Sequence, residues 1–129
     1  MISGTSFVIT RWEDVADEVA RRNGGVAAVS DLERIGAKCA AGQALALSGP
    51  DGIVVVELLG GQTGLVLWIW IAAGAHAGAF RRAESALEAI ARDMGASTIA
   101  FRPARAGWQR LAGQQWQRRG ECLERSVHG

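Results

Sequence analysis

The residues with the clearest chemical potential form a small-residue turn, residues 72–78, between a strand pattern and a helix pattern. A dense apolar run over residues 65–71 precedes the turn, and helical spacing follows it over residues 79–94. Backbone N–H groups at a helix start lack internal partners, and the helix dipole favours negative charge there. The sequence therefore predicts an anion site with the candidate contacts Ile71, Ala72, Ala73, Gly74, His76, Ala77, Gly78 and Ala79. In the alternative interpretation, the turn is small only because helix and sheet pack closely there.

The potential metal ligands and thiols do not form a recognisable site. Cys39 and Cys122 are far apart, and together with His76 and His128 they give no spacing typical of zinc. Two reduced, half-buried thiols are the simpler interpretation, and they are typical of a cytosolic protein. We therefore expect no metal.

The length of the chain favours one domain over residues 1–129, and its charge implies no strong attraction to nucleic acid or membrane. The net charge is +1, although the segment from Phe101 onward carries six Arg and two Glu. A basic tail could face phosphates, but unclustered Arg residues usually form a solvated surface, so nucleic acid is not the expected partner. We see no signal peptide, and the apolar run over residues 65–73 is too short to cross a bilayer. We expect a cytoplasmic protein.

The first half of the chain predicts a strand and two helices. Residues 7–9 form a short apolar run, and Thr10 and Glu13 have the spacing of a capping box. Ser30 and Glu33 have the same spacing before a second helical stripe that ends at Gly42. Each helix thus has a predicted start and stop.

The second half predicts strands around a long central helix. Residues 44–47, 53–59 and 65–71 read as a meander joined by turns that contain glycine. The apolar stripe of residues 79–94 predicts a helix, and residues 97–101 a strand parallel to the third meander strand. A short helix over residues 107–113 and a hairpin over residues 115–127 complete the chain.

This order resembles the GNAT superfamily of N-acetyltransferases over nearly the whole chain. Three features carry the resemblance: the strand–turn–helix of residues 65–94, the helix end and strand of residues 91–99, and the segments Gly107–Ala112 and Trp116–Gly120. The resemblance implies an α+β, three-layer fold. Its central sheet would be mixed and mostly antiparallel, with helices on both sides, in the order β-α-α-β-β-β-α-β-α-β-β.

The resemblance also implies a cosubstrate, acetyl-CoA, whose pyrophosphate binds the turn before the long helix. The family pattern there is Gln/Arg-x-x-Gly-x-Gly/Ala, and the aligned hexapeptide here is residues 75–80. Gly78 matches the central glycine, whereas Ala75 and Phe80 depart from the first and last positions. Small residues still allow backbone N–H groups to approach a phosphate.

Acetyl transfer requires a base for the amine and a donor for the thioester oxyanion. The family often uses a Glu as the base and a Tyr as the acid. This chain has no Tyr, and Glu57 is the candidate base; its alternative interpretation is a solvent-facing strand residue. His76 is a second candidate for a base or a phosphate contact. Trp68 and Trp70 point to one strand face and could line an acceptor pocket or the core.

The resulting expectation is an acyl-CoA-dependent N-acyltransferase that acts on an amine of unknown identity. The alternative is a catalytically inactive GNAT-shaped binding or assembly module, motivated by the degenerate turn, the missing Tyr and the five Trp residues. Edge strands, including the terminal hairpin, also make a homodimer an expectation.

Overall fold

A seven-stranded mixed sheet with helices on both faces organises the molecule. The computed structural model describes residues 7–22, 29–50, 52–62, 64–74, 79–102 and 115–127. The elements are β1 (Val8–Thr10), α1 (Trp12–Arg22), α2 (Val29–Ala40), β2 (Ala44–Gly49), β3 (Gly52–Gly61), β4 (Gly64–Gly74), α3 (Ala79–Asp93), β5 (Ala96–Phe101), β6 (Gln117–Arg119) and β7 (Cys122–Ser126). The expected α+β class is confirmed.

The strand order is β1-β2-β3-β4-β5-β7-β6. Strands β1 to β4 pair antiparallel, as a meander with short turns requires. The α3 crossover makes β4 and β5 parallel, which confirms the predicted β–α–β unit. The terminal hairpin returns antiparallel, so that β7 lies beside β5 and β6 forms the edge.

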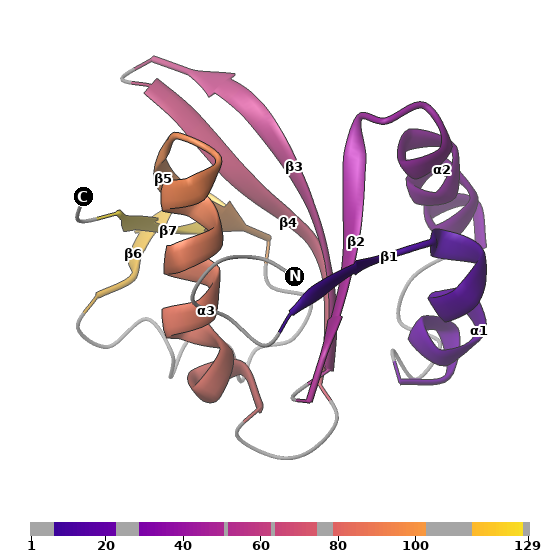
Figure 1. Ribbon diagram of the computed structural model, residues 1–129. Coiled ribbons are helices and arrows are strands. Elements are labelled where there is room, and N and C mark those ends of the chain that lie inside the picture. Colours follow the sequence, from indigo (N-terminus) through magenta and orange to yellow (C-terminus); the bar gives the residue numbers. More distant parts are fainter. Residues whose placement is uncertain are drawn as a thin grey trace.

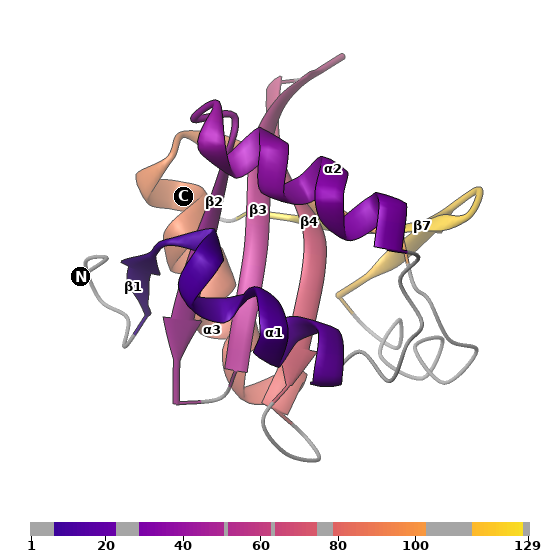
Figure 2. The same ribbon diagram turned by 90° about the vertical axis from the view of Figure 1, so that its right-hand side faces the viewer.

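The helices divide between the two faces of the sheet. Figure 1 shows α1 and α2 on one side of the central strands and α3 on the other. The turned view in Figure 2 shows α1 and α2 crossing in front of β3 and β4. Because both faces are covered, β3 is buried continuously from Gly52 to Glu57 and lacks apolar–polar alternation, as expected from its sequence.

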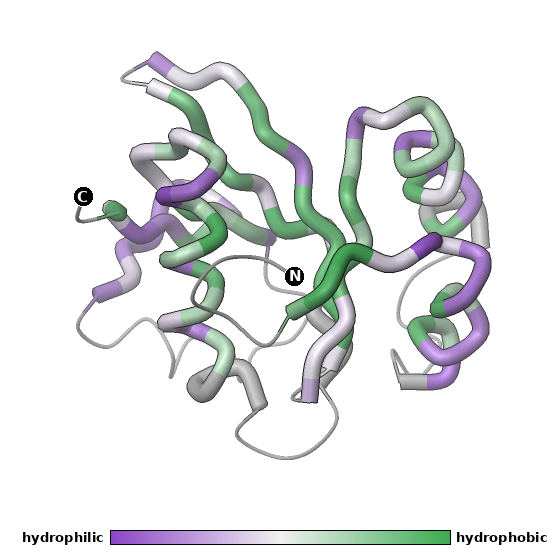
Figure 3. The backbone as a smooth tube through the Cα atoms, viewed as in Figure 1, coloured by the Kyte–Doolittle hydropathy of each residue, from purple (hydrophilic) through white to green (hydrophobic). Residues whose placement is uncertain are grey.

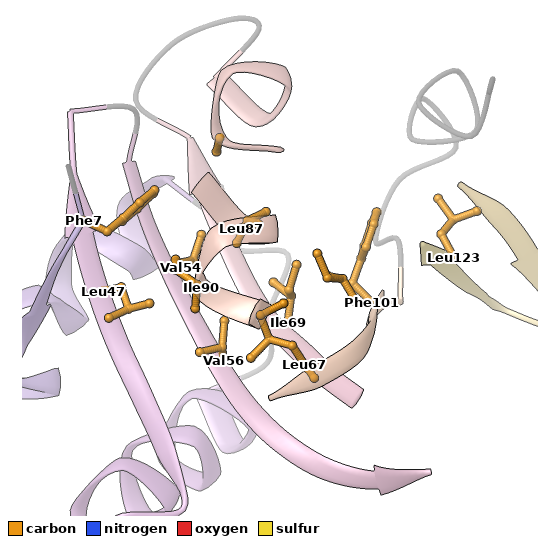
Figure 4. Packing of buried hydrophobic residues seen from close by; sticks show 14 of the residues in the cluster. Phe7, Leu47, Val54, Val56, Leu67, Ile69, Leu87, Ile90, Phe101 and Leu123 are labelled. Carbon is orange, nitrogen blue, oxygen red and sulfur yellow. The ribbon is translucent and has the colours of Figure 1, made fainter. Parts of the chain in front are cut away.

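The larger core lies between the sheet and α3 (Figure 4). Helical spacing brings Ala83, Leu87 and Ile90 onto one side of α3. They pack against side chains from successive strands, including Leu47, Val54, Val56, Leu67, Ile69, Ile99 and Phe101. Figure 3 shows hydrophobic colour along these strands and along one side of α3. Gly95 follows α3 with a φ of 79°, a left-handed conformation that suits glycine and confirms the predicted C-cap.

A second core lies between the sheet and the first two helices. It contains Val15 and Val19 of α1, Ile35 of α2, and Ile53 and Val55 of β3. Close packing of the helices depends on Gly36, because a Cβ there would lie 2.6 Å from Trp12 Nε1. The β3 residues in this second core are odd-numbered, and side chains alternate between the two faces of a strand. Glu57 therefore also points toward the side of α1 and α2.

The two predicted capping boxes are wrong. Thr10 belongs to β1, where it pairs with Ala46, and α1 begins only at Trp12. The Glu13 carboxylate instead accepts a hydrogen bond from Arg11 at 3.2 Å. In the second case α2 already begins at Val29, one residue before the expected cap. Sheet pairing and helix packing thus override the local signal.

The C-terminal part is confirmed where the structure describes it. The hairpin turns at Gly120 between β6 and β7, whereas the short helix expected over residues 107–113 lies outside the described residues. Three Arg side chains there form ion pairs: Arg102 with Glu121, Arg119 with Glu124, and Arg125 with Glu84 and Glu88. Each ion pair neutralises one of the Arg charges that the sequence predicts as a basic tail. Within the described residues, no helix has both the length and the apolarity needed to cross a membrane.

Candidate functional site

Strand β4 has a bulge on its β3 side and extends beyond its pairing with β5 on the other side. The β3–β4 register passes from Val55↔Ile71 to Val56↔Ile69, so Trp70 is the extra residue of a β-bulge. The β4–β5 pairing ends at Ile69↔Phe101, whereas β4 continues to Gly74. Trp70 therefore marks the point beyond which β4 has no described neighbour on the β5 side.

Glu57 lies beside this bulge as a buried carboxylate. It pairs with Trp68 in the β3–β4 ladder and is 9% exposed. The Trp70 indole N–H donates a hydrogen bond to Glu57 Oε1 over 2.9 Å. The interpretation of Glu57 as a solvent-facing residue is therefore wrong: the cover of α2 over this face places the carboxylate against an indole and a helix.

Lys38, in the last turn of α2, provides the opposite charge. Its Nζ lies 3.3 Å from Glu57 Oε1 and 3.4 Å from Oε2. A buried carboxylate is strongly unfavourable alone, and an ion pair with a further hydrogen bond offsets much of its desolvation. The Lys38 side chain remains 26% exposed. Glu57, Lys38 and Trp70 thus form a polar cluster, hereafter the Glu57 cluster, on an otherwise apolar sheet face.

Aromatic rings and a second cation complete the surroundings of the Glu57 cluster. Arg34 Cζ lies 4.9 Å from the Trp70 ring centroid, and Lys38 Nζ lies 5.6 Å from it. Both distances are typical of cation–π contacts. Trp68 meets Trp70 edge to face with centroids 6.0 Å apart. The predicted common direction of the two Trp side chains agrees with this contact.

An open pocket of about 500 Å³ reaches the Glu57 cluster from the side of β2. It forms where β2 begins, because Ala44↔Glu57 is the first pair and β3 runs on to Gly61. Its lining combines the charges of Lys38 and Glu57 with polar and apolar side chains and one glycine: Gly42, Gln43, Leu45, Val56, Leu58 and Met94. The pocket could therefore hold a small ligand that has a polar end and an apolar end.

The predicted anion site is only partly described. Residues 75–78, which include His76, Ala77 and Gly78, lie outside the described residues. The prediction that Ala72, Ala73 and Gly74 lie in the turn is wrong. They belong to β4 and pair with Val54, Ile53 and Gly52. The β2–β3 hairpin turns between Gly49 and Gly52, so β3 is available to pair with β4 as far as Gly74. Strand β4 is therefore longer than its apolar run. Ile71 is buried in the second core, and Ala79 opens α3.

Lys38 is the member of the Glu57 cluster that the sequence did not single out. The apolar stripe of α2 contains Leu32, Ile35 and Cys39, and Lys38 follows Ile35 by three residues. That spacing places Lys38 at the border of the stripe, on the sheet side of the helix. A second signal was its rarity, because Lys38 is the only lysine in the chain. Neither signal identifies Glu57 as its partner.

The thiols do not extend the site. Cys39 and Cys122 are both free and half-buried. Burial, followed by the nearby charge of Glu13, raises the pKa of the Cys39 thiol. Within the described ranges, no three His, Cys, Asp or Glu side chains gather as a metal site would require.

Comparisons with known proteins yield one structural likeness of interest. No protein-family model matches the chain, and no curated protein matches it. A solved structure, a GCN5-related N-acetyltransferase from Kribbella flavida, aligns with a TM-score of 0.45 and 16% sequence identity. The alignment covers 85% of this chain and 33% of that one, so the chain spans about a third of the length of its neighbour. Within the described residues, the element order and the mixed sheet are those expected from the sequence.

Proposed function

We propose that the protein is an N-acyltransferase that moves an acyl group, such as acetyl, from an acyl-CoA thioester to an amine. One observation carries the proposal: β4 leaves β5 at the Trp70 bulge, one hydrogen bond away from the buried carboxylate of Glu57. A strand edge that no described strand pairs with would provide backbone N–H groups for a thioester and its oxyanion, and the carboxylate would provide a base for an amine.

The acyl donor would lie along the open edge of β4. The strand covers ~13 Å between Trp70 and Gly74, at about 3.3 Å per residue. The small residues that follow, Ala77 and Gly78 among them, would then hold the pyrophosphate at the start of α3. In this arrangement the thioester lies near Trp70 and the phosphates lie at the helix.

The acceptor would enter through the pocket beside Glu57. Its ammonium group would displace or join Lys38 at the carboxylate, lose a proton to Glu57 and attack the thioester carbonyl carbon. The chain has no Tyr to protonate the departing sulfur. A thiolate is a good leaving group, and it can take the second proton of the attacking nitrogen, so this step needs no phenol.

Calorimetric titration with acetyl-CoA tests the donor site. The parent should bind, and Gly78→Glu should not, because the new carboxylate repels the pyrophosphate. Gly60→Glu is the matched control: a Cβ at Gly60, at the far end of β3, meets nothing within 4 Å. It adds the same charge away from the site and should bind like the parent. Absence of binding by the parent, or equal loss in both variants, would overturn the donor site.

The alternative function, an assembly module, is favoured by one surface feature. Strand β1 forms an edge of the sheet, and its Val8 and Ile9 are 44% and 60% exposed. Unpaired strand edges with apolar side chains readily add a strand from another chain. A homodimer through this edge is accordingly part of the proposal. Light scattering of the parent and of Ile9→Lys tests it: a dimer should become monomeric in the variant, and a parent that is monomeric at high concentration removes the idea.

A further inference from the structure

The only lysine of the chain lies against the carboxylate proposed as the base. Lys38 Nζ is within 3.4 Å of both Glu57 oxygens, and the same carboxylate binds the Trp70 indole at the bulge. The lysine side chain is neither fully buried nor free, and it lines the open pocket. An amine, a base and a route for a small reactant thus meet at one point.

We propose that Lys38 is itself an acyl acceptor, so that the protein acylates its own α2 helix. This inference rests on the proposed function, because the acyl group comes from an acyl-CoA thioester. It goes beyond that function by naming a modification site. The chemistry that recognises Lys38 is the same that would recognise any cationic acceptor: a carboxylate for the ammonium, and an indole face 5.6 Å away for its charge.

The step balances without a further reactant. Glu57 takes one proton from the Lys38 ammonium, and the neutral nitrogen attacks the thioester carbonyl carbon. A C–N bond forms and the C–S bond breaks. The departing thiolate takes the second proton of the nitrogen, which gives free CoA thiol and an amide on Lys38. Glu57 then releases its proton to water and returns to the carboxylate.

Acylation changes the Glu57 cluster in a defined way. The amide nitrogen of acylated Lys38 carries no charge, so its ion pair with Glu57 is lost. The carboxylate keeps the hydrogen bond from Trp70 and regains a site for a cation. An external amine no longer competes with Lys38 for that site. Self-acylation would therefore open the pocket to other acceptors.

The effect of folding on the reactivity of Lys38 distinguishes a purely structural ion pair from a lysine beside a base. A lysine held as an ammonium in a purely structural salt bridge is protected, so folding should slow its reaction with a thioester. A lysine beside a working base reacts faster when folded, and general-base assistance is worth about 10²-fold or more. The sign of the folding effect thus separates the two roles of Lys38.

The test incubates the full chain with acetyl-CoA and follows Lys38 by intact mass and peptide mapping. The same chain in urea provides the unassisted rate, and the α-amino group provides an internal reference amine. We expect Lys38 to be acetylated about 10²-fold or more faster in the folded chain. Lys38→Arg should remove this modification. Glu57→Gln, which keeps the shape and an acceptor for Trp70, should reduce the Lys38 rate to that in urea.

Each outcome decides the proposal. A folded rate equal to or below the urea rate overturns it, even if Glu57→Gln fails to fold, because that comparison uses the parent alone. If acetyl-CoA fails to bind in the calorimeter, the proposed function and this inference fail together. If acetyl-CoA binds and an added amine is acetylated while Lys38 is not, only this inference fails.

Discussion

The ion pairs between β7 and α3 allow a quantitative prediction about stability. Arg125 donates to Glu84 Oε2 through Nη1 and to Glu88 Oε2 through Nη2, each over 3.0 Å, and its side chain is 10% exposed. Arg125→Met removes the charge that these two contacts share, while Glu88 keeps its ion pair with Arg92 at 3.8 Å. Breaking a buried pair from one side costs about 3–5 kcal/mol. Because both carboxylates keep some access to water, we expect the low end, about 3 kcal/mol.

The matched control is Arg102→Met, which removes the same charge from an exposed pair. Arg102 and Glu121 lie 2.8 Å apart, and their side chains are 67% and 74% exposed. Exposed pairs contribute about 0–1 kcal/mol. Urea unfolding followed by Trp fluorescence measures both losses. Equal losses in the two variants would refute the reasoning, because they would show that burial does not determine the value of these ion pairs.

Two further predictions concern the core and the first thiol. Leu87→Ala should destabilise the protein by about 2–5 kcal/mol, because Leu87 is fully buried between α3 and the sheet; a loss below 1 kcal/mol in the same urea assay would contradict the packing. Cys39 should react slowly with iodoacetamide near neutral pH, because burial and then Glu13 raise its thiol pKa. Since the thiolate is the reactive form, Glu13→Gln should lower that pKa and speed the reaction modestly; a slower reaction would show that the charge of Glu13 does not act on Cys39.

Much of the fold follows from local patterns in the sequence. The apolar stripe of α3 and the glycine-bounded strands β2 to β4 identify their elements, because their spacing and turn residues agree with the final packing. The crossover through α3 then fixes the parallel pairing of β4 and β5. Local patterns that are compatible with both a helix start and a strand were less reliable guides to the structure. Thr10 and Glu13 have the spacing of a helix cap, but Thr10 belongs to β1 and pairs with Ala46 of β2.

The candidate site was harder to predict because it depends on distant contacts. Glu57 and Trp70 could be identified by residue type, yet the burial of Glu57 requires α2 to cover that face of β3. The Lys38–Glu57 pair joins residues 19 apart, on different elements. The bulge at Trp70 has no glycine or other local signature and arises from the register of two strands. None of these three contacts follows from sequence spacing alone.

The measurement that tests the central claim most directly is the release of CoA thiol from acetyl-CoA in the presence of a panel of primary amines. The parent is compared with Glu57→Gln, with acetyl-CoA binding measured on both. We expect amine-dependent release by the parent and a loss of about 10²-fold or more in the variant, at similar acetyl-CoA affinity, because a positioned base contributes that much. No release above the uncatalysed rate by a parent that binds acetyl-CoA, or equal release by parent and variant, would contradict Glu57-dependent acyl transfer.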